Sequence, residues 1–379
     1  MTTPATLRLA VVIDAGDDAA FTHTALAAHA PQAGRITLHP GPGTTSDTAL
    51  AGDLLLALGK PAHIPGRFPN GRPPLWEAAA AWTSGLAVTR MTVLRAHLLD
   101  ERRLLRILGL WRQTGIYLTL VVHRPRLTAA LERALPAGGY TAAHTLGEAR
   151  ALYQGDDTAE GVAPLMPPAP TAAWRWITMA ALNRLVSYDS PQPCTAACSP
   201  PPIVYLQRPA PLAPTPAQSA ALAARLHAAS AHPARAAALA GAVAAGASFQ
   251  QLTTARADGF DLADCTLTLH DRTRYTDGCA IYSLPAWAVP FLHAATQFAR
   301  LTGTPHLLAA PADRPALLRL AETIKIRPPQ PHAGRAGAKR APVVWDWAEK
   351  REALGYEPPP PRALPPGPRV TTAARARTR

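Results

Sequence analysis

The first 155 residues alternate between short apolar runs and longer segments with helical spacing. The short runs are typical of buried strands and lie at 7–13 (LRLAVVI), 36–38, 90–95 and 116–122 (IYLTLVV). Helices are predicted over 48–59, where Ser46 or Asp47 is the cap, and over 75–84, 99–113, 126–135 and 146–153. Strands that alternate with helices are typical of βαβ units, so we predict an α/β domain with a mainly parallel sheet over residues 1–155.

The pattern changes after residue 155. Residues 156–215 are rich in proline and contain a single predicted helix, at 171–189, which indicates a linker. A mainly α domain is predicted over 216–356. It begins with Ala-rich helices, continues with a β-hairpin (CTLTLH and CAIYSL, joined by DRTRYTDG), and ends with helices at 286–301 and 314–325. The Pro- and Arg-rich residues 357–379 are predicted to be a disordered tail.

The charge of the chain narrows the choice of partner. Its 379 residues include 38 Lys and Arg against 25 Asp and Glu, a formal charge of +13. Such an excess favours nucleic acid as partner, or less often an anionic membrane, although a disordered basic tail would supply part of it. No apolar run approaches the ~18–20 residues that cross a bilayer. The N-terminus lacks the pattern of a signal peptide, so we expect a cytoplasmic protein without membrane contact.

Three segments of the second half carry a family resemblance. Residues 246–269 (GASFQQLTTARADGFDLADCTLTL) are similar to a stretch usually written GLR-x-SEL…L-x-W-x-D-I-D…G-TL-x-V. Residues 280–295 (AIYSLPAWAVPFLHAA) resemble R-x-x-PLP followed by a helix, and 326–337 (IRPPQPHAGRAG) resemble a T-PH-x-LRH-T box. In this order, the segments resemble the catalytic domain of tyrosine recombinases, or integrases. The resemblance implies a recombinase-like fold, double-stranded DNA as ligand and a recombinase or transposase as possible partner.

The resemblance also implies a catalytic set, which is incomplete here. The residues that match it or stand in for it are Arg272, His332, Arg335, Trp347 and Tyr356. The first arginine of the family is replaced by Ser248, and its usual glutamate by Gln251. Cleavage of a phosphodiester by tyrosine needs several cationic donors around the phosphate, and arginine is a poor general acid. We therefore predict a pseudoenzyme, in which Tyr356 is a surface or packing residue.

The expected function is DNA binding within a mobile-element or DNA-maintenance system. Phosphate contacts, which position a protein without reading sequence, are expected from Arg256, Arg272, Arg274, Arg327, Arg335, Lys339 and Arg340. Residues 330–340 have an alternative interpretation, as a flexible basic loop without a catalytic role. Two other functions stay open: an active site-specific tyrosine recombinase, and a protein-interaction adaptor without a nucleic-acid role whose charge is only its tail.

The first half resembles the middle of the AAA+ ATPases that assist transposases. The similar segments are 35–61, 92–99 and 114–125 (TGIYLTLVVHRP). No G-x-x-x-x-G-K-[ST] occurs in the chain, and Leu94 and Arg95 stand where the Asp-Glu pair for Mg²⁺ is expected. We predict a degenerate P-loop-like domain without ATP hydrolysis or cofactor. A generic α/β scaffold is the alternative.

Two smaller groups of residues have the chemistry of metal ligands. Asp14, Asp17 and Asp18 follow the first strand, where they either bind Mg²⁺ or cap a helix that begins near Ala19. Cys194 and Cys198 form a C-x₃-C pair, while Cys265 and Cys279 lie at the two ends of the predicted hairpin. Nothing in the sequence brings the two cysteine pairs together, so no metal site is predicted.

Overall fold

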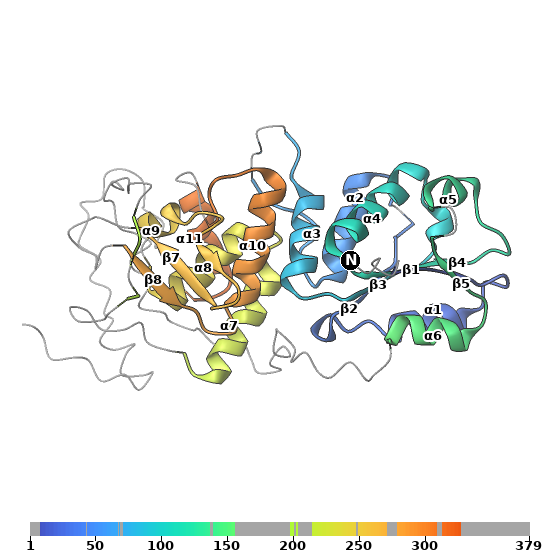
Figure 1. The fold of residues 1–379 in the computed structure, drawn as a ribbon, viewed down its shortest axis with the longest axis horizontal. Helices are drawn as coiled ribbons and strands as arrows, with labels where there is room; N and C mark the ends of the chain where they lie inside the picture. The colour runs from blue at the N-terminus through green and yellow to red at the C-terminus, as the bar shows by residue number, and fades with distance from the viewer. Residues whose placement is uncertain are drawn as a thin grey trace, which may run out of the picture. The chain divides into compact units, whose positions relative to one another are not determined.

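The fold is seen in a computed structural model (Figure 1). The residues that the structure describes are 8–42, 44–66, 68, 71–136, 139–155, 198–200, 202–203, 214–247, 249–270, 279–308 and 313–326. All of them belong to one compact unit, Met1–Pro329. The predicted tail 357–379, the helix at 171–189 and most of the predicted linker lie outside the described residues.

A parallel sheet organises the first part of the chain. Its strands are β1 (Leu9–Ile13), β2 (Arg35–Leu38), β3 (Arg90–Val93), β4 (Tyr117–Val122) and β5 (Thr141–Ala143). They follow the order β2-β3-β4-β1-β5, and every neighbouring pair is parallel. The predicted parallel sheet is thus confirmed. The edge strand β5 was not predicted, because its sequence TAA has no apolar run.

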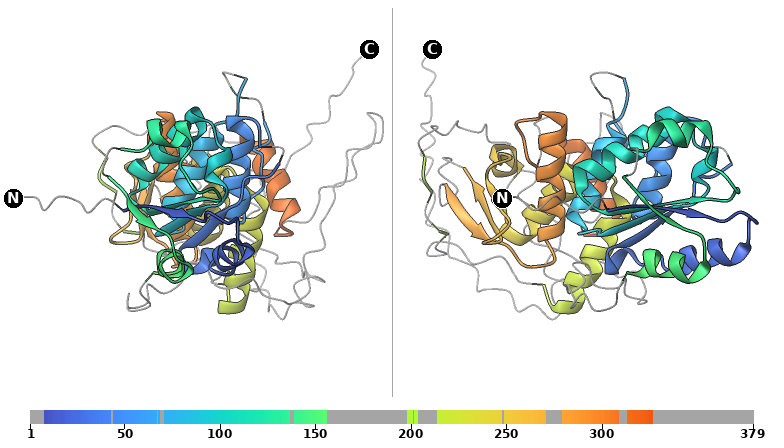
Figure 2. Two further views of the ribbon diagram at one scale, coloured as in Figure 1. Left: turned by 90° about the vertical axis from the view of Figure 1, so that its right-hand side faces the viewer. Right: turned by 45° about the vertical axis from the view of Figure 1, so that its right-hand side comes forward.

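Helices cover both faces of this sheet. One face carries α1 (Ala19–Ala27) and α6 (Leu146–Gln154), and the other carries α2 (Asp47–Ala57), α3 (Leu75–Gly85), α4 (Glu101–Thr114) and α5 (Ala129–Ala134). The side views in Figure 2 show the same two layers. Successive strand residues point to opposite faces of the sheet. Val11 therefore packs in the larger apolar core, and Val12 packs in the smaller one, between the sheet and the helices α1 and α6. Short 3₁₀ turns lie at Pro31–Ala33 and Ala96–Leu98.

The second part is mainly helical and contains a small antiparallel sheet. Its helices are α7 (Pro216–Ala229), α8 (Pro233–Ala245), α9 (Phe249–Thr254), α10 (Val289–Thr302) and α11 (Arg314–Thr323). Its strands are β6 (Phe260–Asp261), β7 (Thr266–Leu269) and β8 (Ala280–Ser283), in the order β6-β7-β8. The predicted β7–β8 pair is confirmed. The two-residue β6 is too short to leave a sequence pattern.

The sheet and the helical part share the larger apolar core. Trp82 on α3 donates its Nε1–H to the carbonyl of Ala231, at 2.8 Å, and its ring and that of Phe291 on α10 form a T-shaped pair. Gly85 permits the close approach of α3 and α10, because a Cβ at this position would lie 2.6 Å from the Cβ of Ala294. In the part of the chain that the structure describes, no helix has both the length and the apolar character to span a bilayer.

Candidate functional site

The first residues beyond β1 and β4 form a buried polar pair. The strand register pairs Ile13 with Val122, and the ladder continues through the N–H of Asp14, which donates to the carbonyl of Val122 at 2.9 Å. His123 therefore lies beside Asp14, with Nδ1 2.7 Å from Oδ2 of the carboxylate. The exposed fractions of the two side chains are 0% for His123 and 3% for Asp14.

This pair lies where ligands bind in many open parallel sheets. The chain leaves β1 toward α1 on one face and leaves β4 toward α5 on the other (Figure 1). Between neighbouring strands whose connections leave to opposite faces, a crevice forms outside the carboxyl ends of the strands. Asp14 and His123 occupy that position, which makes them the centre of a candidate site.

The loop after β1 adds two more carboxylates. Asp17 places Oδ1 3.3 Å from Nδ1 of His123. The N–H of Asp18 donates to Oδ1 of Asp14 at 3.0 Å, and the carboxylate of Asp18 accepts from the N–H of Ala20. The capping role is thereby confirmed for Asp18, which is the N-cap of α1. Asp14 and Asp17 face His123.

The end of β3 contributes a cation and a second imidazole. Arg95, with its backbone in the left-handed region at φ 52°, lies 3.6 Å from Asp17 through Nη2 and Oδ1. His97 accepts a hydrogen bond from the backbone N–H of His123 through Nδ1, at 3.3 Å. Leu94, the other residue at the expected acidic positions, is fully buried. An ion pair and an apolar side chain thus occupy the two positions at which the motif comparison expects acidic residues.

Burial and neighbouring charges shift several ionisable groups at this edge. The pKa of His97 is lowered, first by burial and then by the positive field of Arg124, His123 and Arg95. Burial also lowers the pKa of His39, which follows β2, and Arg95 acts in the same direction. On α6, burial and the nearby Asp14 raise the pKa of the Tyr153 hydroxyl.

The contact with Asp14 holds the imidazole of His123 in one orientation. A carboxylate that accepts from Nδ1–H leaves the lone pair on Nε2, the arrangement that prepares histidine as a base or a metal ligand. The Nε2 of His123 is buried and has no hydrogen-bond partner among the described residues. Asp14, Asp17 and His123 offer ligand atoms within 4.8 Å of one another. However, the guanidinium of Arg95 beside Asp17 opposes a second positive charge there.

A nucleotide is poorly matched to the same edge. Phosphate sites at a helix N-terminus use free backbone N–H groups and the positive end of the helix dipole. Here Asp18 caps α1 itself, and Asp14 and Asp17 add negative charge next to it. These carboxylates would repel the phosphates of a nucleotide.

Of the predicted DNA-contacting residues, the structure describes Arg256. It follows α9, and its guanidinium lies 3.5 Å from Asp258, with both side chains mostly exposed at 68% and 79%. An exposed pair of this kind contributes little to stability. The remaining predicted catalytic and DNA-contacting residues lie outside the described residues: Arg272, Arg274, Arg327, His332, Arg335, Lys339, Arg340, Trp347 and Tyr356.

Gln251, which the motif comparison aligns with the recombinase glutamate, is completely buried. Its side-chain amide donates to the hydroxyl of Tyr282 on β8, at 3.4 Å. Gln251 therefore links α9 to the small sheet through a buried hydrogen bond. Ser248, which replaces the first arginine of the family, is not among the described residues.

Sequence reasoning found only part of the cluster at the carboxyl edge. It singled out Asp14, Asp17, Asp18 and Arg95 and noted His97 beside Arg95, but it missed His39 and His123. The signal was present, because His39 and His123 each follow an apolar strand directly. In a parallel sheet, polar residues in that position gather at one edge.

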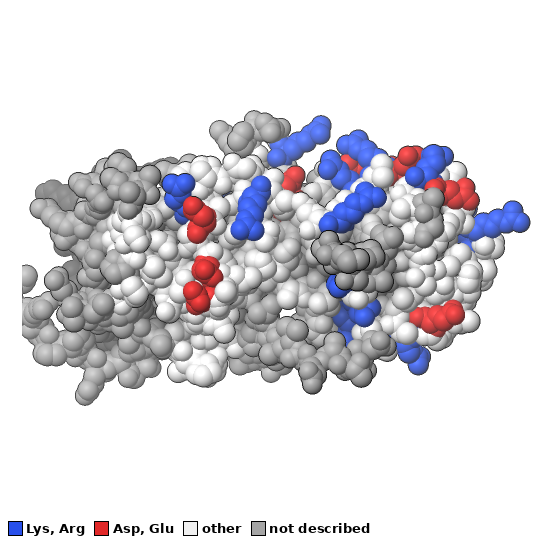
Figure 3. Space-filling view, in the orientation of Figure 1, with Lys and Arg blue, Asp and Glu red and all other residues white. Residues whose placement is uncertain are grey.

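Surface charge on the described residues is mixed. The face drawn in Figure 3 carries Lys and Arg interspersed with Asp and Glu. No family model matches this chain, and neither does any curated protein or solved structure. The likeness to recombinases and to AAA+ ATPases thus rests on the motifs of this sequence.

Proposed function

We propose that this chain is a cytoplasmic DNA-binding protein with a recombinase-like second part that does not cut DNA. It would act in a mobile-element or DNA-maintenance system, next to a partner recombinase or transposase. The observation that carries the proposal is the β7–β8 pair. It follows α9 and β6 and precedes α10 and α11, in the order that the motifs require, and the segment between its strands contains Arg272 and Arg274.

The distribution of charge supports this proposal. Residues 327–379 carry eleven Lys and Arg against four Asp and Glu, so more than half of the net charge of +13 lies there. In the first part, by contrast, several arginines are paired with carboxylates: Arg95, Arg102, Arg103, Arg106 and Arg133. Binding to phosphates releases counterions in proportion to the cations engaged, and cations already neutralised contribute less. We therefore assign DNA contact to the hairpin segment and the residues after 326.

Equilibrium binding of duplex DNA by fluorescence anisotropy tests the proposal. The full chain and a chain ending at residue 356 are compared over a salt series. The tail 357–379 carries five Arg against one Glu, so its removal tests whether the charge of the tail explains the binding. We expect both chains to bind, with affinity that falls steeply with salt. Binding lost with the tail would favour the interaction adaptor, and absent binding at low salt would contradict the proposal.

The absence of cleavage is tested separately. A nicked suicide substrate traps the covalent adduct that an active tyrosine recombinase forms with DNA. We expect no adduct, because Ser248 and Gln251 replace charged members of the catalytic set. A wild-type adduct that disappears in Tyr356→Phe would instead establish an active recombinase.

A further inference from the structure

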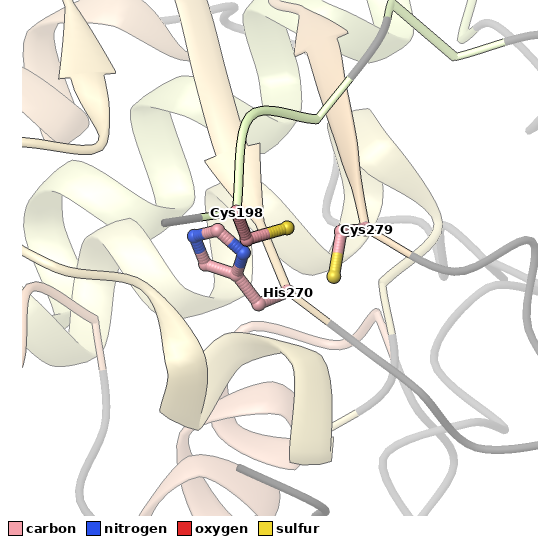
Figure 4. A group of neighbouring side chains, drawn as sticks. All are labelled: Cys198, His270 and Cys279. Carbon is pink, nitrogen blue, oxygen red and sulfur yellow. The ribbon is translucent and has the colours of Figure 1, made fainter. Parts of the chain in front are cut away.

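Three side chains that are distant in sequence gather at the open end of the β7–β8 pair. They are Cys198, His270 and Cys279, and all three are half-buried (Figure 4). The chemistry of the group is that of a metal site, since thiolate and imidazole are the ligands that Zn²⁺ prefers. It lies outside the cluster around Asp14 and uses none of the residues predicted to contact DNA.

Strand register explains why two of the three meet. The antiparallel pairing of Leu269 with Ala280 ends the ladder, so His270 and Cys279 are the next residues and lie opposite each other. The backbone N–H of His270 donates to the hydroxyl of Thr254, at 2.9 Å, which connects this end of β7 to α9. The backbone therefore fixes both residues before any ion binds.

A separate interaction brings the third residue to the same place. Pro202 forms a parallel bridge with Ile281 on β8, and the N–H of Ile203 donates to the carbonyl of Ile281 at 2.9 Å. This pairing holds Pro202 and Ile203 along β8, and Cys198, four positions before Pro202, lies near Cys279. The contact was not predicted, because the sequence places these residues in the proline-rich stretch 156–215.

The spacing of the ligand atoms fits a single ion. The two Sγ atoms and a ring nitrogen of His270 lie within 4.8 Å of one another. In tetrahedral zinc sites, with Zn–S near 2.3 Å, neighbouring ligand atoms are about 3.8 Å apart. A contraction of at most about one ångström, by rotation of these side chains, brings the ligand atoms to that spacing.

We propose that Cys198, His270 and Cys279 bind one structural Zn²⁺. On binding, each thiol loses its proton, so two protons are released and the two thiolates balance the charge of the ion. The neutral imidazole is the third ligand, and a fourth coordination position accepts a water or a further donor. The ion ties the segment 198–203 to both strands of the hairpin. This proposal does not depend on DNA binding.

Metal analysis of the full-length protein, purified with zinc and a thiol reductant, tests the site. We expect one zinc per chain. Cys198→Ser, Cys279→Ser and His270→Gln should each weaken zinc binding by more than about tenfold, the lower end of what even outer-shell changes cost. Cys265→Ser is the matched control. Its thiol is also half-buried and lies just before β7, but it contacts the carbonyl of Leu262 and is not a member of the group.

A second measurement does not depend on whether the ligand variants fold. Wild-type protein stripped of metal is titrated with Co²⁺, which reports thiolate ligation by an intense charge-transfer absorption. We expect that absorption in wild type and Cys265→Ser at one equivalent. Protein that takes up no zinc above background, a cobalt spectrum without thiolate absorption, or an equal loss of zinc in Cys265→Ser would each overturn the proposal.

Discussion

The ammonium group of Lys60 lies 3.2 Å from the ring centroid of Trp82, inside the core shared by the sheet and the helices. Lys60 is 2% exposed, and its Nζ has no hydrogen-bond partner among the described residues. A second ring, that of Phe291, is 5.6 Å away. Two aromatic faces thus replace the water that a lysine normally keeps, which compensates only part of the cost of burial.

Replacing Lys60 by Met should stabilise the protein. Burial lowers the pKa of Lys60 well below its usual value of 10.5. Between the lowered pKa and 10.5, the unfolded chain therefore binds more protons than the folded one, and stability rises with pH. The cost of Lys60 is therefore greatest at low pH and vanishes above that value. We expect Lys60→Met to raise the free energy of unfolding by about 1–3 kcal/mol at pH 7.

Urea unfolding at pH 7 and at pH 10 measures this effect. The gain should shrink at the higher pH, because the unfolded chain is itself losing the proton of Lys60 there. A loss of stability in Lys60→Met at neutral pH would show that the aromatic contacts outweigh the burial of the charge.

His227 should make the protein sensitive to acid. Its Nε2–H donates to the carbonyl of Leu58 at 2.9 Å, where α7 meets the end of α2. Burial, with a contribution from Lys60, lowers its pKa from 6.5 to about 2. Because this pKa is lowered, its contribution to stability is full above pH 6.5 and is lost as pH falls below that value.

Comparison of His227→Gln with the wild type isolates this contribution. At pH 8 the free energy of unfolding of the variant should be about 1 kcal/mol below that of the wild type, which is the value of a hydrogen bond. Between pH 7 and pH 4.5, the free energy of unfolding should fall less in the variant than in the wild type. His23→Gln, at an exposed position of α1, should keep the pH dependence of the wild type. An unchanged pH dependence in His227→Gln would contradict the assignment.

Two glycines in helices should respond to alanine with opposite signs. Gly85 on α3 has no room for a Cβ, which would approach the carbonyl of Pro290 to 2.8 Å. Gly109 on α4 has nothing within 4 Å of the same atom. We expect Gly85→Ala to cost about 1–3 kcal/mol by overpacking, and Gly109→Ala to gain up to about 1 kcal/mol from helix propensity. Thermal unfolding of both variants checks the pair, and a Gly85→Ala protein as stable as wild type would refute close packing of α3 on α10.

Asp14 and His123 should be energetically coupled. Each is the principal polar contact of the other in a buried position, so loss of either leaves an unsatisfied group. In a double-mutant cycle with Asp14→Asn and His123→Gln, we expect a coupling energy of about 1–3 kcal/mol from urea unfolding. Additive effects of the two substitutions would mean that the contact contributes nothing specific.

Much of the fold could be predicted from the sequence, because buried strands and amphipathic helices leave a periodic signal. The structure confirms β1 to β4, α2 with its cap at Ser46, and the β7–β8 pair. The strands β5 and β6 were missed because two or three residues carry no period. Local pattern also gives no information on packing between segments, such as that of α3 on α10.

The candidate sites show the same limit. Asp14 was visible because three acidic residues follow one strand, whereas the histidines around it come from separate strands. Cys198 and Cys279 are 81 positions apart by their numbering, and only the pairing of residues 202 and 281 reveals that they meet. Contacts of this kind depend on register and topology, which the order of residues does not display.

The most direct test of the central claim compares two charge-matched double variants of the full chain in duplex DNA binding. Arg272→Ala with Arg274→Ala removes two cations from the hairpin segment. Arg102→Ala with Arg133→Ala removes two exposed, carboxylate-paired cations from the first part. We predict that the hairpin variant binds more weakly, with the slope of log affinity against log salt reduced by about two, while the control binds as wild type. Equal loss in both variants would show that only net charge attracts DNA, and would contradict a binding surface at the hairpin.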